Sequence, residues 1–187
     1  MIDKPRIENA IREIILAIND NPTREGLIET PQRVARMYAE IFAGQNFTND
    51  EIADMFNKCF TSNSKDIVIL EDIKIFSFCE HHLALMYDMN VSVAYFPNRK
   101  IIGLSKIVRI VEMVGKRLQL QERIGNDIAY ILTKILDTED VFVKIAAKHS
   151  CVTMRGIKNS NVITTTYCKR GRFFKERIIE NEHSTIH

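Results

Sequence analysis

Apolar residues recur at the spacing of a helix face through the first sixty positions of the chain. The first stripe consists of isoleucines, at Ile7, Ile11, Ile14, Ile15 and Ile18. Thr30-Pro31 predicts a new helix start, because threonine is a favoured cap and proline at the first helical position sacrifices no hydrogen bond. The stripe that follows is Val34, Met37, Tyr38, Ile41 and Phe42, and we expect Gly44 to end it. A shorter helix is predicted around Ile52, Met55, Phe56 and Cys59.

The pattern changes after the polar segment 61–65, which we interpret as a linker. Segments rich in Ile, Val, Phe and Tyr predict strands at 67–76 and 90–96. Two amphipathic helices should follow, with the inward residues Leu104, Ile107, Val108, Val111 and Val114 on the first and Ile124, Ile128, Ile131, Leu132 and Ile135 on the second. Alternating apolar residues predict a half-buried strand at 141–148, and a last β-rich segment covers 162–167.

The predicted order is strand–strand–helix–helix–strand–strand behind an N-terminal helical extension, which indicates an α+β fold. We expect a helical region over residues 1–64, an α+β domain over 65–180 and a C-terminal tail over 181–187.

Composition narrows the classes of function. The chain has 187 residues, with 45% hydrophobic and 27% charged, as is ordinary for a soluble globular protein. A formal net charge of +2 is too small to indicate nucleic-acid binding, and no apolar run is long enough to span a membrane. The first residues lack the features of a secretory signal. We therefore expect a cytoplasmic protein whose four cysteines stay reduced and serve metal binding or catalysis rather than disulfides.

Two short segments concentrate the residues that bind zinc. They are Cys79-Glu80-His81-His82 and His149-Ser150-Cys151. Thiolate and imidazole are zinc ligands, and three protein ligands with one open position are typical of a catalytic site. Cys79, His82 and Cys151 form a plausible trio, although spacing alone does not decide between His81 and His82. The alternative is that both cysteines are buried, inert thiols. The residues alone thus predict a zinc hydrolase of unknown substrate.

Several longer motifs resemble the GTP cyclohydrolase I family. They occur in the family's order, from roughly residue 7 to residue 175, and are Glu29-Thr30-Pro31-Gln32-Arg33, Cys79-Glu80-His81-His82, Tyr95-Phe96-Pro97, Gly103-Leu104-Ser105-Lys106-Ile107-Val108-Arg109, Gln119-Leu120-Gln121-Glu122-Arg123, His149-Ser150-Cys151-Val152-Thr153-Met154-Arg155-Gly156 and Thr164-Thr165-Thr166. The resemblance implies a tunnelling fold, a homodecamer with active sites between subunits, and conversion of GTP and water to 7,8-dihydroneopterin triphosphate and formate, the first step of folate and pterin synthesis.

The resemblance also implies roles for the metal and catalytic residues. Cys79, His82 and Cys151 would hold one Zn²⁺ per subunit, and the metal would acidify the water that attacks C8 of guanine. His149 would protonate N7 of guanine and His81 would assist ring opening, tasks that suit imidazole because it titrates near neutrality. Ser105 would act in the later chemistry of the ribose.

Substrate binding follows from the same resemblance. Glu122 would accept hydrogen bonds from N1–H and the 2-amino group of guanine, and Gln121 would lie beside it in the pocket. The triphosphate would be held by Lys106, Arg109 and Arg155, and by Arg33 from a neighbouring subunit. Guanidinium groups suit this task because they bind phosphate oxygens in a bidentate fashion.

Three segments depart from the family pattern, namely Ser150, 83–88 and 167–170.

Two other hypotheses about the function stay open. One is another tunnelling-fold enzyme that acts on a pterin or a deazapurine, although such relatives use other metal or nucleophile patterns. The other is a non-catalytic zinc module, to which the basic tail Lys169, Arg170, Arg172, Lys175 and Arg177 would belong. A fourth protein ligand would support the zinc module, and no further Cys or His fits that position well.

Overall fold

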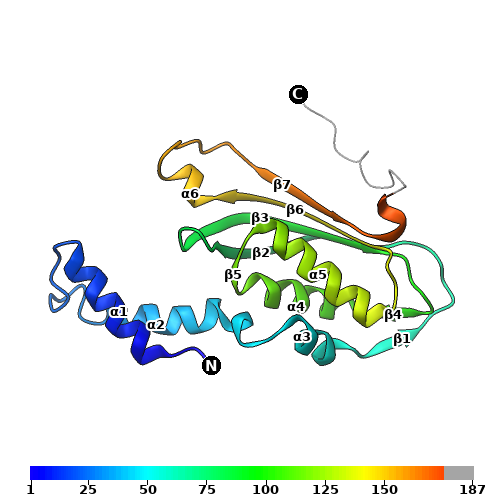
Figure 1. The fold of residues 1–187 in the computed structure, drawn as a ribbon, viewed down its shortest axis with the longest axis horizontal. Helices are drawn as coiled ribbons and strands as arrows, with labels where there is room; N and C mark the ends of the chain where they lie inside the picture. Colours follow the sequence, from blue (N-terminus) through cyan, green and yellow to red (C-terminus); the bar gives the residue numbers. More distant parts are fainter. Residues whose placement is uncertain (175–187) are drawn as a thin grey trace.

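The structure is a computed structural model that describes residues 1–174 of the chain. Its main feature is a five-stranded sheet in the order β5-β2-β3-β6-β7 (Figure 1). The strands are β2 (Val68–Cys79), β3 (Ala84–Tyr95), β5 (Leu118–Gln119), β6 (Val141–His149) and β7 (Thr164–Lys169). All neighbours are antiparallel except β5, which pairs parallel to the end of β2. The order of long elements confirms the predicted α+β fold.

Helices α4 (Leu104–Gly115) and α5 (Gln121–Leu136) cover one face of the sheet (Figure 1). Helix α5 packs on β6 and β7, and α4 packs on β2. The predicted inward residues of α5 are all buried, whereas Leu104, the first residue of α4, is 58% exposed. Burial of each such side chain contributes about 1.5–3 kcal/mol, so these two stripes hold the helices on the sheet.

The two longest strands extend further than predicted. The first continues to Cys79 and the second begins at Ala84 instead of residue 90. The pairing of β3 with β6 shifts register between Tyr87 and Asn90, and Asp88 in that gap has a φ of 49°. Such a bulge interrupts the period of two, so the alternation that marks a strand is lost there.

The predicted N-terminal helices are present as α1 (Lys4–Ala17), α2 (Thr30–Ile41) and α3 (Asn49–Phe56), with the short 3₁₀ segment η1 (Ala43–Asn46) between the last two. Thr30 lies inside α2, whose cap residue is Glu29. Helices α1 and α2 pack on each other and project beyond the sheet (Figure 1). Of the five isoleucines in the first stripe only Ile15 is buried, because this hairpin has little else to pack against within one chain.

A small second sheet was not predicted. Strand β1 (Cys59–Thr61) pairs antiparallel with β4 (Lys100–Ile102), so the placement of Cys59 on a helix was wrong. Three residues are too few for an alternating pattern to be recognised. The division of the chain near residue 64 stays a prediction.

The remaining elements are the single helical turn α6 (Ser150–Thr153) and the 3₁₀ segment η2 (Gly171–Phe174). Lys175, Arg177 and the predicted tail 181–187 lie outside the described residues. Within residues 1–174, every helix is too short or too polar to cross a bilayer.

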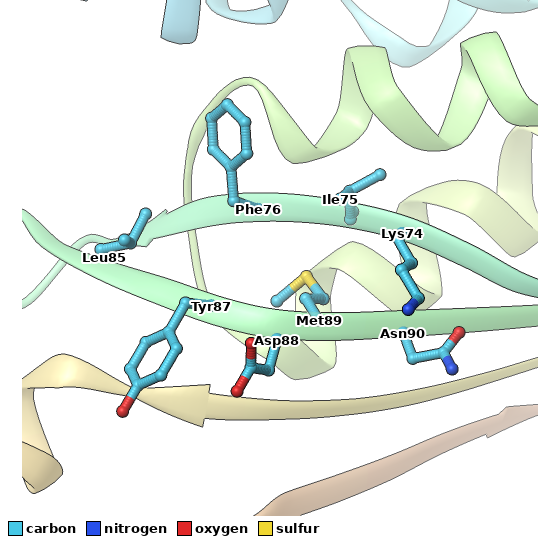
Figure 2. A pocket seen from close by; sticks show the side chains of 8 residues that line it. All are labelled: Lys74, Ile75, Phe76, Leu85, Tyr87, Asp88, Met89 and Asn90. Atoms are coloured by element: carbon cyan, nitrogen blue, oxygen red, sulfur yellow. The ribbon is translucent and has the colours of Figure 1, made fainter.

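A surface hollow of ≈ 700 Å³ lies over β2 and β3 (Figure 2). Its lining residues are Lys74, Ile75, Phe76, Leu85, Tyr87, Asp88, Met89 and Asn90. None of the residues predicted to bind metal or substrate, or to take part in catalysis, is among them, so the candidate site lies elsewhere on the molecule.

Candidate metal centre and active site

Antiparallel pairing brings the two Cys/His segments to one edge of the sheet. Cys79, the last residue of β2, pairs with Ala84 at the start of β3. His149, the last residue of β6, pairs with Met86 two positions further along β3. Because β3 runs antiparallel to both of its neighbours, the carboxyl ends of β2 and β6 lie at the same edge of the sheet, on either side of β3. The register of β3 therefore sets the distance between the two segments.

Cys79, His82 and Cys151 form a cluster whose ligand atoms all lie within 4.8 Å of one another. Cys79 is buried, Cys151 is half-buried and His82 is exposed. Ligand atoms around a tetrahedral zinc lie about 3.5–3.8 Å apart, given Zn–S and Zn–N bonds of about 2.0–2.3 Å. Small side-chain adjustments would therefore suffice, and the donor set of two thiols and one imidazole fits Zn²⁺. Of the two neighbouring histidines, the geometry places His82 in this cluster.

The turn α6 holds Cys151 over the start of β3. The Ser150 hydroxyl donates to the Leu85 carbonyl at 2.7 Å, and the Tyr87 hydroxyl donates to Thr153 Oγ1 at 3.2 Å. Ser150, one of the departures noted in the sequence, thus anchors the turn that carries Cys151.

The electrostatics of the cluster favour a bound cation. Burial raises the pKa of the Cys151 thiol, and the neighbouring Cys79 raises it further. Two adjacent thiols are difficult to ionise together in such surroundings unless a positive charge compensates them. A divalent metal would supply that charge. The exposed Arg155 lies at the same place, with Nη1 3.2 Å from His82 Nε2.

Two further histidines flank the cluster. His81 is exposed and its Nδ1 lies 3.8 Å from Cys79 Sγ. His149 is half-buried and its Nε2 lies 2.8 Å from Gln121 Oε1. Burial lowers the pKa of His149, while the nearby carboxylate of Glu122 acts in the opposite direction. Of these two flanking imidazoles, one is exposed and the other favours its neutral form.

Helix α5 begins at the edge of the sheet where the cluster lies. Glu122 there is exposed, next to the buried Gln121. The Arg123 guanidinium donates two hydrogen bonds, of 2.6 and 3.1 Å, to the Glu80 carboxylate, and this pairing lowers the pKa of Glu80. The pair ties the turn that carries His81 and His82 to α5. Sequence reasoning assigned Arg123 no role, because nothing in the sequence links residues 80 and 123.

Ser105 and Lys106, in the first turn of α4, lie at the opposite end of the domain, and Arg109 is exposed further along the same helix. Lys106 Nζ donates to the Lys58 carbonyl at 2.7 Å, and the adjacent Cys59 Sγ donates to the Ile135 carbonyl near the end of α5. Residue 135 is about 20 Å from residue 121 along a helix axis that rises 1.5 Å per residue. The N-terminal end of α4 is therefore remote from the metal cluster of its own chain.

Arg33 is also separate from the cluster. It is exposed on α2, where it pairs with Glu29 at 2.5 Å. A single chain thus brings together Cys79, His82, Cys151, His81, His149, Gln121, Glu122 and Arg155, but not Ser105, Lys106, Arg109 or Arg33.

A Cys₂His cluster with adjacent histidines, at the edge of an antiparallel sheet covered by two helices, is typical of a metal-dependent hydrolytic enzyme. Comparison with known proteins gives the particular family. The family model described as GTP cyclohydrolase I matches residues 7–187.

Curated relatives agree with this match. The chain is 56% identical over 187 residues to a protein of Clostridium botulinum named GTP cyclohydrolase 1, with 97% of this chain and 95% of that one covered. It is 57% identical over 186 residues to a protein of the same name from Ruminiclostridium cellulolyticum, with 96% and 95% covered. The chain belongs to the GTP cyclohydrolase I family.

Proposed function

We propose that this enzyme converts GTP and water to 7,8-dihydroneopterin triphosphate and formate, using a zinc ion held by Cys79, His82 and Cys151. The observation that carries the proposal is the Cys₂His cluster with His81 and His149 beside it, in a chain of this family. When bound, zinc acidifies a water molecule and so provides a nucleophile at neutral pH. The two thiols need a reducing compartment, so we place the enzyme in the cytoplasm.

The chain's own groups have distinct tasks in this proposal. Glu122, exposed at the start of α5, accepts hydrogen bonds from N1–H and the 2-amino group of guanine. Adenine lacks this pair of donors, so the contact distinguishes GTP from ATP. His149 gives a proton to N7 and His81 assists opening of the ring, while Arg155 beside His82 meets the triphosphate.

We also propose that each active site is shared between subunits of a homo-oligomer, expected to be a decamer. Ser105, Lys106, Arg109 and Arg33 are assigned to the reaction by resemblance. Lys106 lies beside the C-terminal end of α5, about 20 Å along that helix from Gln121, given the helical rise. A neighbouring subunit that presents the N-terminal end of α4 and part of α2 would complete the site.

The test of the reaction is incubation of zinc-loaded protein with GTP, following formate release and formation of the pterin. ATP, metal-depleted protein and the Cys151→Ala variant are the controls. Formate and a pterin from GTP alone, and only with metal, are the expected result. An intact zinc-bound oligomer that releases no formate would refute the proposal and favour another tunnelling-fold enzyme.

The shared site has a separate test. We would co-express Cys151→Ala with Lys106→Met, each of which should be inactive by itself. Mixed oligomers contain sites in which both the metal cluster and the lysine are intact, so activity should return. If the mixed oligomers stay as inactive as the two parents, the lysine does not act across a subunit boundary.

A further inference from the structure

The carboxamide of Gln121 is enclosed by the protein. The residue is 2% exposed. Its Nε2 donates to the Ile145 carbonyl at 3.0 Å and to the Thr164 carbonyl at 2.9 Å, with Thr166 Oγ1 at 3.2 Å. These acceptors come from β6 and β7 close to the place where their pairing ends, after Ala147 and Thr164. The side chain therefore fills the point at which the two strands separate.

This environment determines the orientation of the carboxamide. The nitrogen has two N–H donors, and two carbonyl oxygens face it. In the opposite orientation the amide oxygen would face both carbonyl oxygens, and the nitrogen would lose both acceptors. The oxygen Oε1 must therefore point to the other side, where His149 Nε2 lies 2.8 Å away.

The orientation of Gln121 then determines where the proton sits on His149. An amide oxygen only accepts hydrogen bonds, so the ring nitrogen that contacts it must carry the hydrogen. In the neutral imidazole this leaves Nδ1 as the nitrogen with a free lone pair. We infer that Gln121 is a positioning residue that holds His149 in its Nε2–H tautomer, so that His149 exchanges protons with the substrate through Nδ1. This inference rests on the proposed role of His149.

The same contacts leave little for Gln121 to offer a ligand. Both N–H groups and the carbonyl oxygen already have partners within the chain. The neighbouring Glu122 is exposed and keeps its carboxylate available. Gln121 thus acts on the reaction through His149 rather than by direct contact with guanine.

Two substitutions at position 121 separate this role from substrate binding. Gln121→Met keeps the approximate shape and removes the acceptor for His149. Gln121→Glu, in its protonated form, can still donate to a carbonyl and accept from His149. Gln119→Met is the matched control, because Gln119 is a buried glutamine on the same segment whose amide contacts Asp127 and the Val114 carbonyl rather than His149.

Kinetics and binding are the first readouts. We expect Gln121→Met to lower kcat for formate release about 10- to 100-fold, by analogy with the range for groups that orient a metal-binding histidine. GTP binding to the metal-depleted protein should change little, and Gln121→Glu should recover part of the rate. Weaker GTP binding with an unchanged kcat would overturn the inference and indicate that Gln121 contacts the substrate directly.

The tautomer is measured directly by solid-state NMR of protein labelled with ¹⁵N in its imidazoles, with His149→Ala identifying the resonances. We expect protonated Nε2 and bare Nδ1 in the wild type and in Gln119→Met, and a mixture of tautomers in Gln121→Met. A neutral His149 ring protonated on Nδ1 in the wild type, or an unchanged single tautomer in Gln121→Met, would refute the inference. This readout does not need turnover, so it decides the matter even if GTP proves not to be the substrate.

Discussion

Removal of the Arg117 guanidinium is expected to destabilise the folded chain strongly. Arg117 lies between α4 and β5 and joins the N-terminal segment to helix α5. Its guanidinium donates to the carbonyls of Gly44 and Phe47 at 3.1 and 2.8 Å and to Asn49 Oδ1 at 2.7 Å, and pairs with Asp127 at 3.3 Å. The side chains of Arg117 and Asp127 are only 11% and 17% exposed.

The expected loss in free energy of unfolding follows from these contacts. Four interactions at about 1 kcal/mol each amount to about 4 kcal/mol. Removal of one partner from a buried ion pair costs about 3–5 kcal/mol, because the other charge stays buried without compensation. We therefore expect Arg117→Met to lower the free energy of unfolding by about 4 kcal/mol. The double variant Arg117→Met/Asp127→Asn should lose less free energy of unfolding than the two single variants lose in sum, by about 1–3 kcal/mol.

Urea unfolding of the four species gives this double-mutant cycle. The subunit concentration must be held constant, because assembly contributes to apparent stability. Arg24→Met is the control, since Arg24 pairs with Asp20 at the surface and its loss should matter little. If Arg117→Met is no more destabilising than Arg24→Met, or if the double variant is simply additive, the argument from burial is wrong.

Four further outcomes are expected. Gly44→Ala should destabilise the protein by about 1–3 kcal/mol in thermal unfolding, because the added Cβ would overlap backbone carbonyl oxygens at the end of α4. Cys151→Ala should lose zinc, measured by metal analysis, together with turnover. His149→Ala should keep zinc but release little formate. A hydrogen bond from Lys134 lowers the pKa of Asp50 below 3.8, so its stabilisation is present above that pH and is lost as the pH falls through the folded-state value. Because the pair is exposed, Asp50→Asn should lower the unfolding midpoint only slightly at neutral pH, and not at all in stronger acid.

Local sequence patterns predicted the main elements well. The stripe from Ile124 to Ile135 and the alternation from Val141 to Ala147 each describe one helix or one strand, and each is buried as expected. The prediction was poorer where tertiary structure interrupts the pattern, as at the bulge around Asp88 and in the three-residue strand that begins at Cys59.

The candidate site was likewise predicted in part from local sequence and decided in part by tertiary structure. Cys79-Glu80-His81-His82 and His149-Ser150-Cys151 indicated zinc from residue chemistry alone, because thiols and imidazoles are uncommon and were adjacent in sequence. Which histidine joins the cysteines depends on the path of the turn after β2, and the sequence contains no local signal for that path.

The sequence by itself thus determined the main elements and the α+β class and pointed to a Cys/His metal site, since each depends on side chains that are near one another along the chain. Tertiary structure alone placed His82 in the cluster, joined Glu80 to Arg123 and set Gln121 against His149. The physical reason is that these contacts depend on strand register and on how α5 sits on the sheet, which long-range packing decides.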